Sequence, residues 1–86
     1  MTKKYTYYTQ GTCSSRIDLE IDEQGVLQDV TFYGGCHGNL QGISTLVRGM
    51  QASEVITKLQ GIRCGYKCTS CPDQLATALR EAIENN

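Results

Sequence analysis

Hydrophobic and polar residues alternate in the N-terminal part of the chain, which is the spacing of half-buried strands. Ile17, Leu19 and Ile21 share one face of such a segment, and charged residues occupy the other face. Val30 and Phe32 are expected to point inward from a later segment. Turn-forming residues separate the segments, which predicts an antiparallel meander of three strands. The three predicted strands cover residues 5–9, 16–21 and 26–33.

After residue 38 the apolar positions change to helical spacing, and three helices are predicted. We expect Asn39 to be the N-cap of the first helix and Ser53 that of the second, which Gly61 ends. The third helix begins either with Ser70 as N-cap, or with Pro72 as its first residue and Cys71 as cap. The apolar stripes of the three helices are Leu40, Ile43, Leu46, Val47 and Met50; Val55, Ile56 and Leu59; and Leu75, Ala78, Leu79, Ala82 and Ile83.

This order of elements predicts one α+β domain over residues 1–86, with a three-stranded antiparallel meander followed by three helices on one face. Following the chain up and down through the elements brings every cysteine to the same end of the molecule. None of them falls at a predicted core-facing position inside a strand or helix. The five cysteines are Cys13, Cys36, Cys64, Cys68 and Cys71.

Composition excludes several classes of function. The 86 residues carry a net charge of −1, which gives no electrostatic basis for binding nucleic acid or an anionic membrane. No stretch approaches the roughly 20 apolar residues of a membrane span. The N-terminal residues lack the apolar region of a signal peptide, so we expect a cytosolic protein with reduced thiols. The odd number of cysteines, five, also disfavours a disulfide framework.

The clustered thiols favour a metal site. Cys36 and Cys71 each lie at the start of a predicted helix, where free N–H groups and the helix dipole favour the thiolate. Arg63, Lys67 and Arg16 would offset part of the charge of several thiolates. A tetrahedral zinc site built from four of them would add folding free energy to a small core. No His, Asp or Glu accompanies the thiols as a general base, so a structural or assembly role is favoured over catalysis.

Three sequence blocks carry a family resemblance that covers nearly the whole chain. The blocks GTCSS, GGCHGNLQGISTLVRGM and GIRCGYKCTSCPDQLATAL are similar to those of the TSCPD domain family. The resemblance implies a metal site formed by Cys13, Cys36, Cys64 and Cys71, with Cys68 as a departure from the family pattern. Related domains extend ribonucleotide reductases at the C-terminus, which implies an alternative role as an accessory or redox partner of such a reductase.

A more distant resemblance links the chain to iron–sulfur scaffolds of the IscU/NifU type. Those proteins also carry a cysteine in the first hairpin turn, another after the third strand, and a third before a C-terminal helix. Cys13, Cys36 and Cys71 match these positions. The scaffold's aspartate near the first cysteine is absent, and Ser14 and Ser15 follow Cys13 instead. The resemblance implies an IscU/NifU-like fold and, as a further alternative, a carrier of an iron–sulfur cluster.

Several features have a second interpretation. Cys68 is either a free thiol or, with Cys71, the CxxC motif of a redox pair. His37 fits a turn residue better than an additional ligand. A nucleotide site near the Gly34–Gly35 pair has little support, because GxGxxG and a P-loop lysine are missing. The tyrosines of the first strand favour packing within the sheet over a dimer edge, so a monomer or a weak homodimer is expected.

Overall fold

The three strands form one antiparallel sheet in the order β1-β2-β3, as the sequence predicts. A computed structural model describes residues 2–12, 14–35, 37–66 and 68–84. The strands are β1 (Thr2–Tyr8), β2 (Ser14–Asp22) and β3 (Leu27–Gly34). Asp22 forms the tight turn into β3, because its Oδ1 atom accepts hydrogen bonds from the N–H groups of Gln24 and Val26, both at 2.9 Å. Gly25 completes this turn with a φ of 81°.

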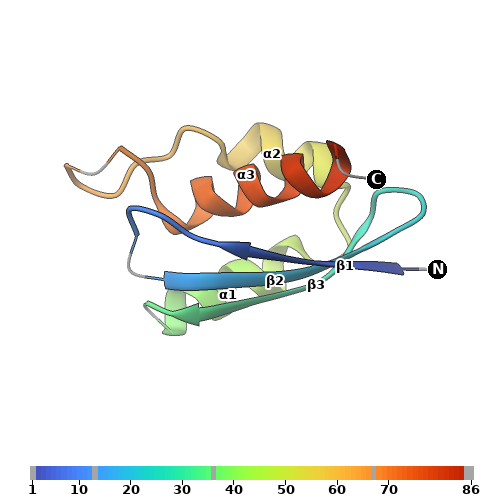
Figure 1. Ribbon diagram of the computed structural model, residues 1–86, viewed down its shortest axis with the longest axis horizontal. Coiled ribbons are helices and arrows are strands. Elements are labelled where there is room, and N and C mark those ends of the chain that lie inside the picture. Colours follow the sequence, from blue (N-terminus) through green and yellow to red (C-terminus); the bar gives the residue numbers. More distant parts are fainter. Residues whose placement is uncertain (1, 13, 36, 67, 85–86) are drawn as a thin grey trace.

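Three helices follow the sheet (Figure 1). They are α1 (His37–Val47), α2 (Ala52–Leu59) and α3 (Cys71–Glu84). Helix α1 packs on β3, α3 packs on β1 and β2, and α2 packs on α3. The alternation in β2 puts Ile17, Leu19 and Ile21 into the core, where they meet Leu75 and Leu79 of α3. The α+β class and the element order are therefore confirmed.

Two residues of the predicted helical stripes lie outside the core. Leu46 is 76% exposed, because six residues of helix place it about 120° around the axis from the buried Leu40. Ile83, near the end of α3, is 42% exposed. Met50 packs against the core as expected, although it follows the end of α1 at Val47.

Two predicted helix starts were wrong. Asn39 is the third residue of α1, which begins at His37, so Asn39 is not its N-cap. Helix α2 starts one residue before Ser53, and its N-cap is Gln51, whose side chain makes no capping hydrogen bond. The reason is tertiary: the N–H of Ala52 donates to the carbonyl of Gly25 at 2.8 Å, and Gln51 pairs with Val26. The sheet therefore sets where α2 begins.

Ser70 is the N-cap of α3, which decides between the two predicted starts. Its hydroxyl oxygen accepts the N–H of Asp73 at 3.1 Å and donates its own hydrogen to the carbonyl of Ile62 at 2.6 Å. Cys71 and Pro72 are the first two residues of the helix. The carboxylate of Asp73 does not complete a capping box, because it accepts hydrogen bonds from the N–H of Gly61 and the hydroxyl of Thr69.

We expect Ser70→Ala to lower the free energy of unfolding by about 0.5–2 kcal/mol, because it removes a helix cap and a second hydrogen bond. Ser53→Ala is the matched control, since Ser53 is an exposed serine near a helix start with no capping role, and it should change stability by less than about 0.5 kcal/mol. Urea unfolding followed by circular dichroism measures both. Equal losses in the two variants would contradict the assignment of Ser70 as the cap.

Candidate functional site

The segments that flank the cysteines meet at one end of the molecule. Figure 1 shows the β1–β2 turn, the end of β3, the start of α1 and the long loop before α3 at this end. Ser14, the first residue of β2, pairs with Gly34 at the end of β3. The strand ends, helix starts and loops that flank the cysteines therefore lie together, as predicted, in the part of the chain that the structure describes. Cys13, Cys36 and Lys67 lie outside the described residues.

Cys64 and Cys71 line one cavity of about 340 Å³ at this end. Leu40 and Ile43 of α1 form its apolar wall. Asn39, Ser70 and Pro72 complete the lining. Cys64 is exposed and comes from the loop, whereas Cys71 is buried at the start of α3. Two of the four predicted ligands thus border a common space next to the start of α1, which directly follows Cys36 in the sequence.

Cys71 lies at the buried start of α3, beside a hydroxyl group. Its side chain is only 7% exposed, which differs from the expectation that no cysteine would be buried within a regular element. As the first residue of α3, it lies among the N–H groups that have no partner within the helix. The hydroxyl oxygen of Ser14 lies 3.2 Å from its sulfur, so this hydroxyl can donate to a thiolate. A second hydroxyl, that of Thr12, lies 3.1 Å from that of Ser14.

Ser14 is a site residue that sequence reasoning noted only as the neighbour of Cys13. It is 5% exposed, although it precedes the first apolar position of β2 by three residues. The contact with Cys71 joins positions 57 residues apart. No local pattern indicates such a contact, because it depends on how α3 crosses the sheet.

The loop that carries Cys64 and Cys68 is tied back to α3 by hydrogen bonds. The N–H of Cys64 donates to the carbonyl of Thr69 at 3.1 Å. Asp73 holds both ends of the loop, since its carboxylate accepts hydrogen bonds from the hydroxyl of Thr69 and from the N–H of Gly61, the latter at 2.6 Å.

The negative charge of Asp73 also acts on Tyr7 of β1. The pKa of Tyr7 is raised by the partial burial of its side chain and by the negative charges of Glu81 and Asp73.

Gln74 connects this loop to the β1–β2 turn. Its side-chain oxygen accepts the N–H of Gln10 at 3.0 Å, and its side-chain nitrogen donates to the hydroxyl of Thr69 at 3.0 Å. Gln74 is only 8% exposed, so these bonds lie largely away from water. The amide therefore fixes the turn before Cys13 relative to the loop before Cys71.

We expect Gln74→Leu to lower the free energy of unfolding by about 1–2 kcal/mol, because two hydrogen bonds are lost while the volume is kept. The amide hydrogen of Gln10 should also exchange faster with solvent. Gln60→Leu, at an exposed glutamine, is the control and should leave that exchange rate unchanged. An unaltered Gln10 exchange rate in Gln74→Leu would show that Gln74 does not hold the turn.

The remaining predicted residues are placed as follows. Cys68 is exposed in the loop. His37 begins α1, and its side chain lies outside the part that the structure describes. Within the described ranges, no three His, Cys, Asp or Glu side chains come close enough to hold a metal ion. Cys64, Cys68 and Cys71, all within the described ranges, therefore do not form a three-thiol group by themselves.

The expected charge compensation by Arg16 was wrong. Arg16 lies on the open face of the sheet, where its guanidinium stacks 4.0 Å from the centre of the Tyr33 ring. Its Nε atom also lies 3.3 Å from Asp18. The alternation of β2 explains this, since Arg16 points away from the face that carries Ile17. Arg63 is exposed in the loop that carries Cys64 and Cys68, and it remains a source of positive charge there.

Comparison with known proteins matches the chain to one family. A family model described as the TSCPD domain matches residues 1–83. No curated protein and no solved structure matches the chain. In the part of the chain that the structure describes, no helix combines the length and the apolar character needed to cross a membrane.

Proposed function

The chain belongs to the TSCPD domain family, and from this membership and the surroundings of its thiols we propose that it is a small zinc-binding domain with a structural or assembly role. The ligands in this proposal are Cys13, Cys36, Cys64 and Cys71. The observation that carries the proposal is the common cavity bordered by Cys64 and Cys71 beside the start of α1. The β1–β2 turn and the start of α1, the segments next to the other two proposed ligands in the sequence, lie at the same end of the molecule.

The donor chemistry fits zinc. Four thiolates suit the tetrahedral coordination of Zn²⁺, and a zinc ion bound in this way would add folding free energy. The hydroxyl of Ser14 and the N–H groups at the start of α3 would hold Cys71 in its deprotonated form. Gln74 and Asp73 would hold the turn and the loop in place before the metal binds. Such preorganisation reduces the cost of assembling the site.

The same four thiolate ligands favour a structural or assembly role over catalysis. Four sulfur ligands leave no open position for a substrate or an activated water. Apart from Cys64 and Cys71, which are proposed ligands, the described lining of the cavity contains apolar side chains and the polar groups of Asn39 and Ser70, none of which is a general base at neutral pH. The sulfur of Cys68 is outside the proposed ligand set, in an exposed loop position.

Metal analysis of protein purified without oxygen tests the proposal. We expect a colourless protein that contains about one zinc ion per chain. Brown protein with iron and acid-labile sulfide would overturn the zinc proposal in favour of a cluster carrier. Metal-free protein with a titratable dithiol would overturn it in favour of a redox protein that uses Cys68 and Cys71.

A further inference from the structure

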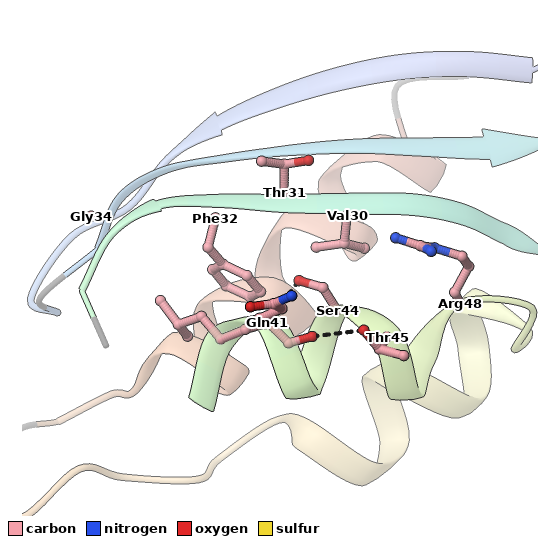
Figure 2. A pocket seen from close by; sticks show the side chains of 9 residues that line it. Val30, Thr31, Phe32, Gly34, Gln41, Ser44, Thr45 and Arg48 are labelled. Atoms are coloured by element: carbon pink, nitrogen blue, oxygen red, sulfur yellow. Dashed lines mark hydrogen bonds between the residues drawn. The ribbon is translucent and has the colours of Figure 1, made fainter. Parts of the chain in front are cut away.

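A second hollow lies between strand β3 and helix α1, and Leu40 borders both this hollow and the cavity of Cys64 and Cys71. This hollow, here called the β3 edge groove, has a volume of about 460 Å³. Figure 2 shows α1 running alongside β3, with Gln41 near Phe32 and Arg48 near Val30. The groove is lined by Val30, Thr31, Phe32, Gly34, Leu40, Gln41, Ser44, Thr45 and Arg48.

The lining shows that the groove follows the edge of the strand. Thr31 and Phe32 are neighbours in β3, and neighbouring side chains of a strand point to opposite faces of the sheet. A groove that contacts both of them must run along the outer edge of the strand, where backbone groups point. Strand β3 is the last strand in the order β1-β2-β3, so this edge has no neighbouring strand.

The chain itself covers only the first part of this edge. Leu27 exchanges two backbone hydrogen bonds there, accepting from Gly49 and donating to Met50, both at 2.8 Å. The N–H of Val30 is satisfied by the carboxylate of Asp29 at 3.0 Å. Such covering protects an edge against unwanted strand pairing.

The last part of the edge is left open. Tyr33 directs its carbonyl toward β2, where it accepts the hydroxyl of Ser15 at 3.1 Å. Backbone groups alternate in direction along a strand, so those of Phe32 and Gly34 point into the groove. Within the described residues, no backbone hydrogen bond reaches Phe32 or Gly34 from outside the sheet. An extended backbone is the partner that complements such a row of donors and acceptors.

Helix α1 forms the opposite wall. Gln41, Ser44, Thr45 and Arg48 follow the i, i+3, i+4, i+7 spacing of one helix face. The hydroxyls of Ser44 and Thr45 donate to carbonyls of their own helix, so their hydrogens are satisfied without a ligand. Phe32 and Leu40 add apolar surface to the floor. Together with Val30, Phe32 and Leu40 favour small apolar side chains on the part of a ligand that faces them.

Arg48 lies at one end of the groove, where it forms an ion pair with Asp29. One nitrogen of its guanidinium lies 3.0 Å from Asp29, and both side chains are 54% exposed. A guanidinium has five N–H donors, so Arg48 can bind a second carboxylate while it keeps this contact.

We propose that the β3 edge groove binds an extended peptide segment of a partner protein, which adds as a short fourth strand beside Phe32 and Gly34. The segment carries small apolar residues at alternate positions and an acidic residue that reaches Arg48. A single strand fits this place better than a second copy of the chain, because α1 stands beside the open edge and would meet the α1 of the other copy. The inference is independent of the proposed metal.

Titration of the isotope-labelled protein with designed peptides tests this inference. The probes are blocked hexapeptides of alternating valine and threonine that end in glutamate, glutamine or lysine, prepared in both orders and added up to about 5 mM. We expect the amide signals of Phe32, Gly34 and Thr45 to shift and the Phe32 amide to become protected from solvent exchange. The glutamate peptide should bind about two- to fivefold more tightly than the lysine peptide, the range of an exposed ion pair.

Two tryptophan variants provide the control. Thr45→Trp fills the groove and should weaken peptide binding about fivefold or more. Leu46→Trp, one residue further along α1 and already 76% exposed, should bind like the parent. Shifts confined to other parts of the protein, or no shift with any peptide, would overturn the inference. Protection of Phe32 that grows with protein concentration in the absence of peptide would overturn it in favour of a second copy.

Discussion

Replacing Cys71 with serine is expected to abolish stoichiometric zinc binding and to lower the melting temperature by at least about 10 °C. A serine hydroxyl stays protonated at neutral pH and cannot replace a thiolate in the zinc site. Serine is close to cysteine in size, so the buried start of α3 keeps its packing. The loss of stability therefore comes mainly from the metal. Metal analysis and thermal unfolding of the purified variant measure the two effects.

Cys68→Ser is the matched control, because Cys68 lies in the same loop but is exposed and outside the proposed ligand set. It should retain zinc and unfold within about 2 °C of the parent. Removing zinc from the parent with a strong chelator should reproduce the low melting temperature of Cys71→Ser. Loss of zinc in Cys68→Ser together with retention in Cys64→Ser would identify Cys68 as the fourth ligand instead.

Leu79→Ala is expected to lower the free energy of unfolding by about 2–5 kcal/mol. Leu79 is fully buried in α3, where it packs with the core side chains of β2. Truncation removes its apolar contacts and leaves a cavity. For a domain of this size, the loss corresponds to a fall in melting temperature of about 10–30 °C. Urea and thermal unfolding check the result.

Leu46→Ala makes the same chemical change at a leucine that the helical spacing also assigned to the core. Because Leu46 is largely exposed, the change should alter stability by less than about 0.5 kcal/mol. A loss comparable to that of Leu79→Ala would mean that Leu46 is buried in solution and that α1 is turned differently on β3.

The sequence by itself determined the class of fold and the order of its elements. The alternation of Ile17, Leu19 and Ile21 requires a strand with one buried face, and that face is the one the helices cover. Turn residues such as Gly25 fix the meander locally. The capping role of Ser70 was one of two predicted helix starts. These features depend on neighbours within a few residues, so a local pattern is sufficient.

The sequence also predicted that the β1–β2 turn, the end of β3 and the loop before α3 lie at one end of the molecule, because strand direction follows from short turns. It did not reveal the contact between Ser14 and Cys71, or the two hydrogen bonds of Gln74. Gln10 and Gln74 are 64 residues apart, and many polar residues could have met across such a distance. Only the packing of α3 against the sheet selects the pairs Ser14–Cys71 and Gln10–Gln74.

Tertiary structure alone decided where α2 begins, where Arg16 points and that β3 has an open edge beside α1. The N–H of Ala52 binds the β2–β3 turn, which overrides the local preference for Ser53 as a cap. The β3 edge groove needs two elements whose distance and tilt depend on the whole core. Local propensity specifies strands and helices because it acts through adjacent backbone groups, whereas a groove is the space left between elements after their apolar faces have packed.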